Sequence, residues 1–206
     1  MTPNLLIAGF RQYNQRVKHY MQYTEANSEN ELIEGCRQGN RLAQKHLYKM
    51  FYSPMLSVCM RYTRNKEEAV EVLNDSFLKV FQGIEAYEGK GAFGGWVRSI
   101  VFHTAIDYVR KNNSYKKTID LESTYESEIE SEVIDRLTAQ ELMALIQKVT
   151  PASQTVFSLF AIEGYSHKEI ADMLNISVGT SKWHLANARK ELKVMVMNTG
   201  NYLIAI

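Results

Sequence analysis

Apolar residues recur at three- and four-residue intervals along most of the 206-residue chain, and no stretch alternates apolar and polar positions as a strand would. This period predicts helices whose apolar stripes face a shared core. Prolines, which interrupt helices, occur at only three positions: 3, 54 and 151. We therefore expect an all-α fold.

Polar residues at the ends of the periodic stretches predict where the first helices begin. Ser28 and Glu31 form the pattern of a capping box, so a helix is expected to start at Ser28. Asn40 suits the N-cap of a second helix, and Pro54 suits the first turn of a third. Further helices are expected over about residues 66–83 and 95–111, and the glycine-rich sequence GKGAFGG between them predicts a loop.

The chain changes character after residue 111. Residues 112–131 contain few apolar side chains and become acidic in their second half, as a solvated linker does. This linker separates a helical domain at residues 28–111 from a second one at residues 132–206, and residues 1–27 form an N-terminal extension. The second domain is predicted to contain four helices.

The sequence GYSHKEIADMLNISVGTSKWHL has the spacing of a helix-turn-helix. Ser166 and Glu169 form a capping box for its first helix, and Ser177 caps the second. A helical wheel places an apolar stripe inward and a polar set outward on the second helix. The inward set is Ser181, Leu185, Ala188 and Leu192; the outward set is Thr180, Trp183, His184, Asn187 and Lys190.

Basic residues flank that outward face, at Lys182, Arg189 and Lys193. Phosphates would lie there if the helix entered a major groove, so we interpret it as a DNA-reading helix. The alternative is an ordinary amphipathic helix whose polar face meets only water.

Three acidic residues at four-residue spacing mark the helix predicted over residues 66–83: Glu67, Glu71 and Asp75. Like charges at this spacing destabilise a helix by a few tenths of a kcal/mol per pair, which a basic partner would offset. The alternative is a solvated acidic face relieved by Lys79.

Composition narrows the possible functions. The net charge is +1, and the two cysteines, which lie outside any metal-ligand cluster, fit reduced thiols in a cytosol. No signal peptide or membrane span is expected, so we expect a cytoplasmic protein. An all-helical metal oxidase would need paired ExxH motifs, and none occurs, so no metal, cofactor or catalytic residue is expected.

Four stretches together resemble the extracytoplasmic-function group of bacterial RNA polymerase sigma factors: EEAVEVLNDSFLKVF, FGGW, WVRSIVFHTAIDYVRK and GYSHKEIADMLNISVGTSKWHLANARKEL. The resemblance implies a non-catalytic transcription initiation factor. Its first domain would dock on the beta-prime clamp helices of core polymerase and melt the minus-ten element. Its second would meet the beta flap and read the minus-thirty-five element as duplex. Promoter DNA and an anti-sigma factor are the other partners that the resemblance implies.

The resemblance also implies site residues. Polymerase contacts are expected at Glu71, Asn74 and Asp75. Contacts in the minus-ten region are expected at Lys90, Phe93, Trp96, Arg98, His103, Asp107, Arg110 and Lys111. Contacts from the helix-turn-helix are expected at Ser177, Thr180, Lys182, Trp183, His184, Asn187, Arg189 and Lys190. For Phe93 and Trp96 the alternative is that these aromatic rings pin the glycine-rich loop to the core.

Several positions differ from the family pattern. His103 replaces a usual asparagine, and His184 and Asn187 stand where arginines are often found. Asn187 could instead pair with an adenine edge. A second family is also similar, because TPASQTVFSLFAIEGYSHKEIADMLNISVGTSKWHL resembles the DNA-binding domain of LuxR-type regulators. That alternative requires an upstream sensor or receiver domain, usually with strands.

Overall fold

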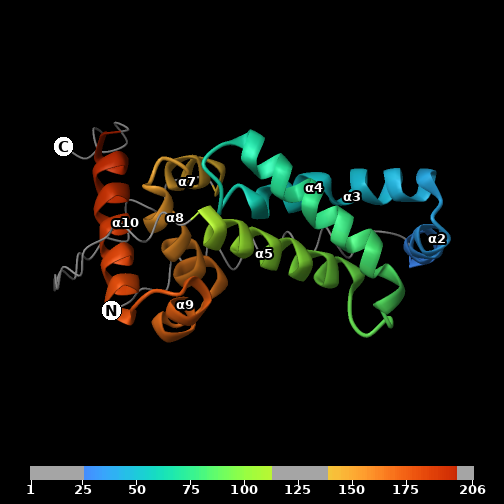
Figure 1. The fold of residues 1–206 in the computed structure, drawn as a ribbon. Helices are drawn as coiled ribbons and strands as arrows, with labels where there is room; N and C mark the ends of the chain where they lie inside the picture. Colours follow the sequence, from blue (N-terminus) through green and yellow to red (C-terminus); the bar gives the residue numbers. More distant parts are fainter. Residues whose placement is uncertain (1–25, 113–138, 199–206) are drawn as a thin grey trace. The chain divides into compact units, whose positions relative to one another are not determined.

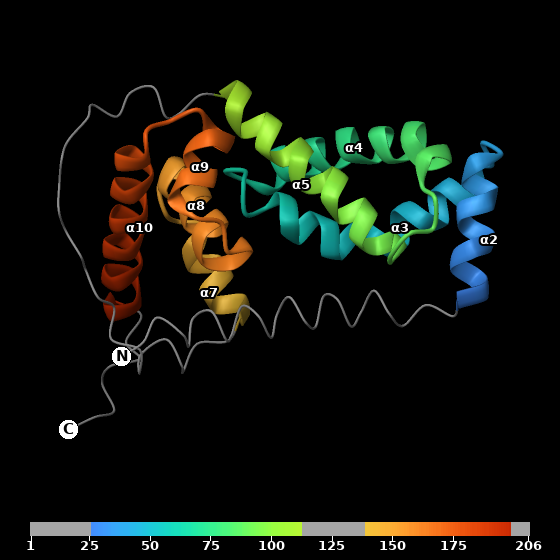
Figure 2. The same cartoon turned by 90° about the horizontal axis from the view of Figure 1, so that it is seen from below.

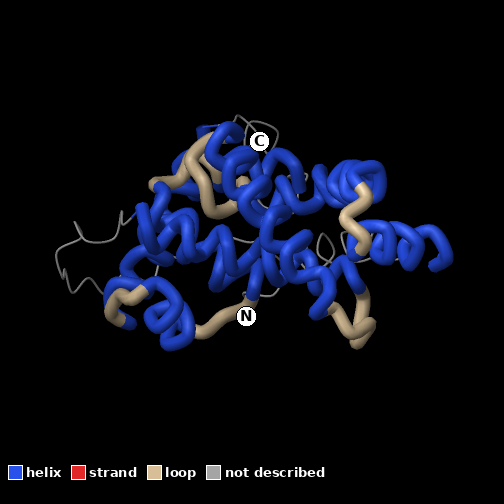
Figure 3. Tube along the Cα trace, turned by 45° about the vertical axis from the view of Figure 1, so that its right-hand side comes forward, coloured by secondary structure: helices blue, strands red, loops and turns tan. Residues whose placement is uncertain are grey.

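The computed structural model describes residues 26–112 and 139–198 (Figure 1). Throughout these two ranges the regular elements are helices joined by loops, which confirms the all-α fold (Figure 3). The chain divides into two compact units, with the break at residues 108–109 near the end of α5. The predicted N-terminal extension and linker lie almost entirely outside the described residues, and the domain boundaries stay a prediction.

The first unit is built from four α-helices and one turn of 3₁₀ helix in the described range 26–112. These are α2 (Ala26–Arg37), α3 (Arg41–Cys59), α4 (Lys66–Gly83), η1 (Ile84–Ala86) and α5 (Phe93–Asn112). Helix α3 packs against both α2 and α4, and α4 runs beside α5 (Figures 1 and 2). Their apolar stripes bury a core that includes Phe51, Met55, Leu73, Phe77, Phe93 and Val101.

Helix α3 corrects the prediction of two separate helices. It is continuous from Arg41 to Cys59 with Pro54 inside it. A proline removes one backbone donor and usually kinks or ends a helix. Here the buried side chains Phe51 and Met55, on either side of Pro54, anchor both halves of α3 in the same core. The predicted cap at Asn40 is confirmed, because its side chain accepts hydrogen bonds from the backbone nitrogens of residues 42 and 43 at 2.9 and 3.3 Å.

Two other boundaries differ from the prediction. Helix α2 begins at Ala26, two residues before the expected cap at Ser28, so Ser28 lies inside the first turn of the helix and not at its N-cap. Helix α5 begins at Phe93, so the predicted loop is shorter and its last three residues join the first turn of α5. Gly89 and Gly91 remain in the loop with φ of 75° and 89°, a left-handed conformation that glycine adopts without strain.

In its described residues, 139–198, the second unit has four α-helices and contains the predicted helix-turn-helix. Its elements are α7 (Ala139–Ile146), α8 (Pro151–Phe157), the π-helical turn η3 (Ser158–Glu163), α9 (His167–Leu174) and α10 (Val178–Asn198). The capping box at the start of α9 is confirmed by both of its bonds, Glu169 N to Ser166 Oγ at 3.3 Å and Ser166 N to Glu169 Oε2 at 2.8 Å. Helix α10 packs against α7, α8 and α9.

Candidate functional site

Helix α4 presents an exposed acidic face. Glu67, Glu71 and Asp75 are exposed, while the opposite side of the helix, including Leu73 and Phe77, is buried. Asn65 fixes the start of the helix by accepting a hydrogen bond from Glu68 N at 2.8 Å. The acidic side chains are therefore held in one row on a rigid helix.

Two residues near the acidic face, Lys79 and Leu78, affect what this face could bind. Lys79, which was considered as relief for the stripe, instead turns toward α5: its Nζ donates to Thr104 Oγ1 at 3.1 Å and lies 3.9 Å from Asp107 Oδ2. Leu78 is 59% exposed beside the stripe, and the sequence reasoning missed it. Its spacing of three residues from Asp75 places it on the same side of α4 and was the available signal.

The glycine-rich loop is held by a cluster of aromatic rings. The ring centre of Phe93 lies 5.0 Å from Tyr87, 5.6 Å from Trp96 and 5.9 Å from Phe51. Phe93 is only 1% exposed, which favours the alternative in which this ring pins the loop to the core, and its contact with DNA stays an untested prediction. Trp96 is half-buried against the same cluster.

Two hydrogen bonds fix the backbone of this loop. Tyr87 Oη donates to the carbonyl of Gly91 at 2.7 Å, and Arg37 Nη2 donates to the carbonyl of Tyr87 at 2.7 Å. The loop backbone is thereby hydrogen-bonded to Arg37 of α2 and to the hydroxyl of Tyr87.

The outer face of α5 carries the remaining residues expected in the minus-ten region. His103, Asp107, Arg110 and Lys111 are exposed, Arg98 is half-buried, and Lys90 is exposed in the preceding loop beside Glu88. The imidazole Nδ1 of His103 lies 2.7 Å from the carbonyl of Ser99. The structure thus places His103, Asp107 and Arg110 on one exposed face, as expected. Their contact with DNA stays a prediction.

Helix α10 confirms the predicted inner face and corrects the outer one. Ser181, Leu185, Ala188 and Leu192 are all buried. His184, expected to face outward, is only 3% exposed, and its Nδ1 lies 3.1 Å from Ser153 Oγ of α8. An imidazole buried in this way offers little surface to DNA, so the geometry does not support the expected contact by His184. Both α8 and α9 cover α10, so its buried arc is wider than the single inner stripe of the wheel. This burial lowers the pKa of His184 to about 4.

Asn187 also turns toward α8. Its Nδ2 donates to Ser153 Oγ at 3.1 Å and to the Glu191 carboxylate. That carboxylate in turn accepts from the backbone nitrogen and hydroxyl of Thr150, at 2.9 and 3.1 Å. We call these five side chains, Thr150, Ser153, His184, Asn187 and Glu191, the polar seam. Reading an adenine requires the amide donor that Asn187 uses in the seam, so the geometry does not support that expectation.

The outward arc of α10 carries three lysines, one in its N-terminal half and two in its C-terminal half. Lys182, Lys190 and Lys193 are exposed, and Trp183 and Ala186 are half-buried between them. At the start of the helix Ser177 Oγ accepts from Thr180 N at 2.9 Å and lies 2.8 Å from Thr180 Oγ1, as its capping role requires.

His167 lies beside this arc, on α9. Its Nδ1 is 2.9 Å from Ser181 Oγ. Burial, followed by the charges of Lys182 and Arg189, lowers the pKa of His167. The charges of Lys182 and Arg189 therefore reach the imidazole of His167.

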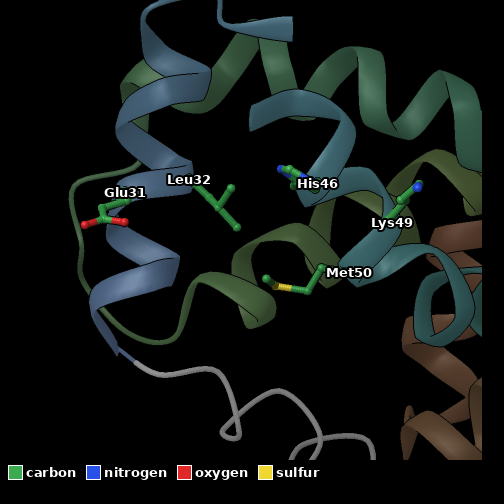
Figure 4. Close-up of a pocket in the computed structure, with 5 residues that line it drawn as sticks. All are labelled: Glu31, Leu32, His46, Lys49 and Met50. Atoms are coloured by element: carbon green, nitrogen blue, oxygen red, sulfur yellow. The ribbon is translucent and has the colours of Figure 1, made fainter. Parts of the chain in front are cut away.

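A groove of about 590 Å³ lies between α2 and α3 (Figure 4). Leu32 and Met50 supply its apolar lining, and Glu31, His46 and Lys49 surround it. No pattern in the sequence predicted this groove.

In residues 26–112 and 139–198, no three His, Cys, Asp or Glu side chains gather as a metal ion would require. No helix in the same residues is long and apolar enough to cross a membrane. Cys36 and Cys59 are buried free thiols, and burial raises the pKa of Cys59 to about 12.

Comparisons with known proteins agree with this arrangement of two helical units. The chain matches the family model of Sigma-70 region 2 over residues 47–115 and that of Sigma-70 region 4 over residues 139–192. Together the two matches cover more than half of the chain. The LuxR-type alternative is not supported, since a sigma region and not a sensor domain precedes the helix-turn-helix.

Individual relatives match both units. The RNA polymerase sigma factor YlaC of Bacillus subtilis is 27% identical over 152 residues, which cover 71% of this chain and 88% of that protein. The ECF RNA polymerase sigma-E factor of Haemophilus influenzae is 25% identical over 178 residues, covering 79% and 92%. Among solved structures, CnrH in complex with the cytosolic domain of CnrY matches with a TM-score of 0.42 and 17% identity, covering 84% of this chain and 99% of that one.

Proposed function

Because this chain belongs to the extracytoplasmic-function group of bacterial RNA polymerase sigma factors, we propose a division of that group's work between its two units. As a sigma factor the chain is a transcription initiation factor that binds core RNA polymerase and directs it to promoters. In our proposal residues 28–111 dock on the polymerase and engage the minus-ten element, and residues 132–206 read the minus-thirty-five element as duplex. The polymerase carries the chemistry, so we assign the chain no catalytic residue, metal or cofactor, and we place its work in the cytoplasm.

The exposed acidic face of α4 is the observation that carries the docking half of the proposal. Glu67, Glu71 and Asp75 are exposed in one row, and Lys79 bonds toward α5 instead of neutralising them. Repulsion along such a row weakens the isolated helix. A basic surface, which the family resemblance identifies as the beta-prime clamp helices, would remove this repulsion, and the exposed Leu78 adds an apolar contact beside it.

The two other proposed surfaces are basic. The outer face of α5 presents His103, Arg110 and Lys111 toward the melted minus-ten strand, where backbone charge is the main source of affinity. The outward arc of α10 presents Lys182, Lys190 and Lys193 toward duplex phosphates. We also propose the beta flap as a contact of the second unit, and an anti-sigma factor as a regulatory partner expected of the group.

Charge reversal on α4 tests the docking proposal. We expect the double substitution Glu71→Lys and Asp75→Lys to abolish co-purification of the full chain with core RNA polymerase, because the row would then repel a basic partner. The matched control reverses two other exposed carboxylates of the first unit, away from the row, Glu31→Lys and Glu85→Lys, and should co-purify normally. Normal co-purification of the α4 variant, with helicity unchanged by circular dichroism, would refute the role of this face.

A further inference from the structure

The N-terminal half of α10, which in a helix-turn-helix meets the base edges, presents mostly carbon to the outside. Val178 is 41% exposed, Gly179 is exposed, and Trp183 and Ala186 are half-buried on the same side. Residues spaced by three, four and seven share one face of a helix, so Gly179, Trp183 and Ala186 lie together. Lys182 is the only charged residue among positions 178–187.

Polar side chains in this half of the helix are engaged within the protein. The Thr180 hydroxyl lies 2.8 Å from Ser177 Oγ. His184 is buried against Ser153, and the amide nitrogen of Asn187 bonds to Ser153 and Glu191. Among the charged and amide side chains of this half, hydrogen-bond readout of bases is therefore left to Lys182, beside the indole N–H of Trp183.

The major groove offers one apolar group for an apolar side chain to recognise, the C5-methyl of thymine. We propose that Trp183 and Ala186 recognise thymine methyl groups in the upstream promoter element, while Lys182, Lys190 and Lys193 hold the flanking phosphates. This inference rests on the proposed function, since it requires α10 to enter the major groove of the minus-thirty-five duplex. Contact with thymine methyl groups would give α10 a sequence preference, although the amide of Asn187 and the imidazole of His184 face inward.

Replacing thymine by deoxyuridine tests the inference, because deoxyuridine pairs as thymine does and lacks only the methyl group. The holoenzyme, made from the full chain and core polymerase, first selects promoter duplexes from a randomised pool. The selected duplexes are then synthesised with thymine or with deoxyuridine in the upstream element alone. We expect each contacted thymine to contribute about three- to fivefold in affinity, as burial of one methyl-sized group does.

Substitutions assign the effect to residues. Trp183→Ala should weaken binding to the thymine duplex and bring the thymine-to-deoxyuridine affinity ratio close to one. Ala186→Ser, which places a hydroxyl at the proposed contact with little change of size, should also lower this ratio. The matched control Lys193→Ala removes a phosphate contact, so it should weaken both duplexes by the same factor and reduce the salt dependence.

The outcomes separate the inference from the proposed function. Selective promoter binding with equal affinity for thymine and deoxyuridine duplexes would overturn the inference and leave the proposed function standing. An unchanged affinity ratio in both Trp183→Ala and Ala186→Ser would also overturn it. Failure of the holoenzyme to enrich any promoter duplex would instead refute the proposed function.

Discussion

His184 makes the stability of the second unit depend on pH. Its imidazole is 3% exposed and beside Ser153, and burial lowers its pKa from an ordinary 6.5 to about 4. The neutral form is thus favoured in the folded state, whereas the unfolded chain takes up a proton near pH 6.5. Stability is therefore fully present above pH 6.5, falls as the pH is lowered, and reaches its minimum below about pH 4.

The size of this effect follows from the shift. One pKa unit corresponds to about 1.4 kcal/mol, so the full loss between neutral pH and pH 4 is roughly 3 kcal/mol, and about 2 kcal/mol is already lost at pH 5. For a unit this small, with a urea dependence of about 1 kcal/mol per molar, the urea midpoint should fall by about 2 M from pH 7 to pH 5.

Trp183 provides the assay, because its ring centre lies 4.9 Å from that of His184 and the chain has only one other tryptophan, Trp96. In the full chain carrying Trp96→Phe, tryptophan fluorescence during urea unfolding at pH 7, 6 and 5 reports the second unit alone. His184→Gln, which cannot titrate, is the control, and it leaves the smaller effect of His167 in place. Equal changes of midpoint with pH in both proteins would refute the reasoning.

Two further predictions concern packing and capping. Gly35→Ala should destabilise the first unit by about 1–3 kcal/mol, because the added Cβ would lie 2.7 Å from Ala43 Cβ of α3, while Gly95→Ala meets open space and should not destabilise it. Thermal unfolding of both variants checks this, and equal melting temperatures would contradict it. Ser166→Ala should remove the cap of α9 and destabilise the second unit by about 1 kcal/mol, as measured by urea unfolding; a loss below about 0.3 kcal/mol would show that Glu169 alone suffices.

Local signals in the sequence predicted the elements that depend on a few neighbouring residues. The capping box of α9 and the cap at Asn40 could both be predicted from the sequence, because their hydrogen bonds join residues at most three positions apart. The prediction of two helices separated at Pro54 was wrong. The continuity of α3 depends on packing of Phe51 and Met55 in a core formed by several helices, which the local sequence does not show.

The outer surfaces were harder to predict for a related reason. A helical wheel gives directions around one helix but not how many neighbours cover it. His184 is buried because α8 lies against α10, and Phe93 is buried because Tyr87 and Phe51 close around it. Both facts depend on residues at least six positions away in the sequence.

The polar seam divides α10 into two faces on which a substitution has different consequences. Substituting His184, Asn187 or Glu191 would disturb bonds to α8 and so alter the domain itself. Substituting Lys182, Trp183 or Ala186 would change what the helix meets outside and leave those bonds in place. In the DNA-reading role that we propose, substitutions on the outward face can therefore change promoter preference while the seam keeps the helix in the same position.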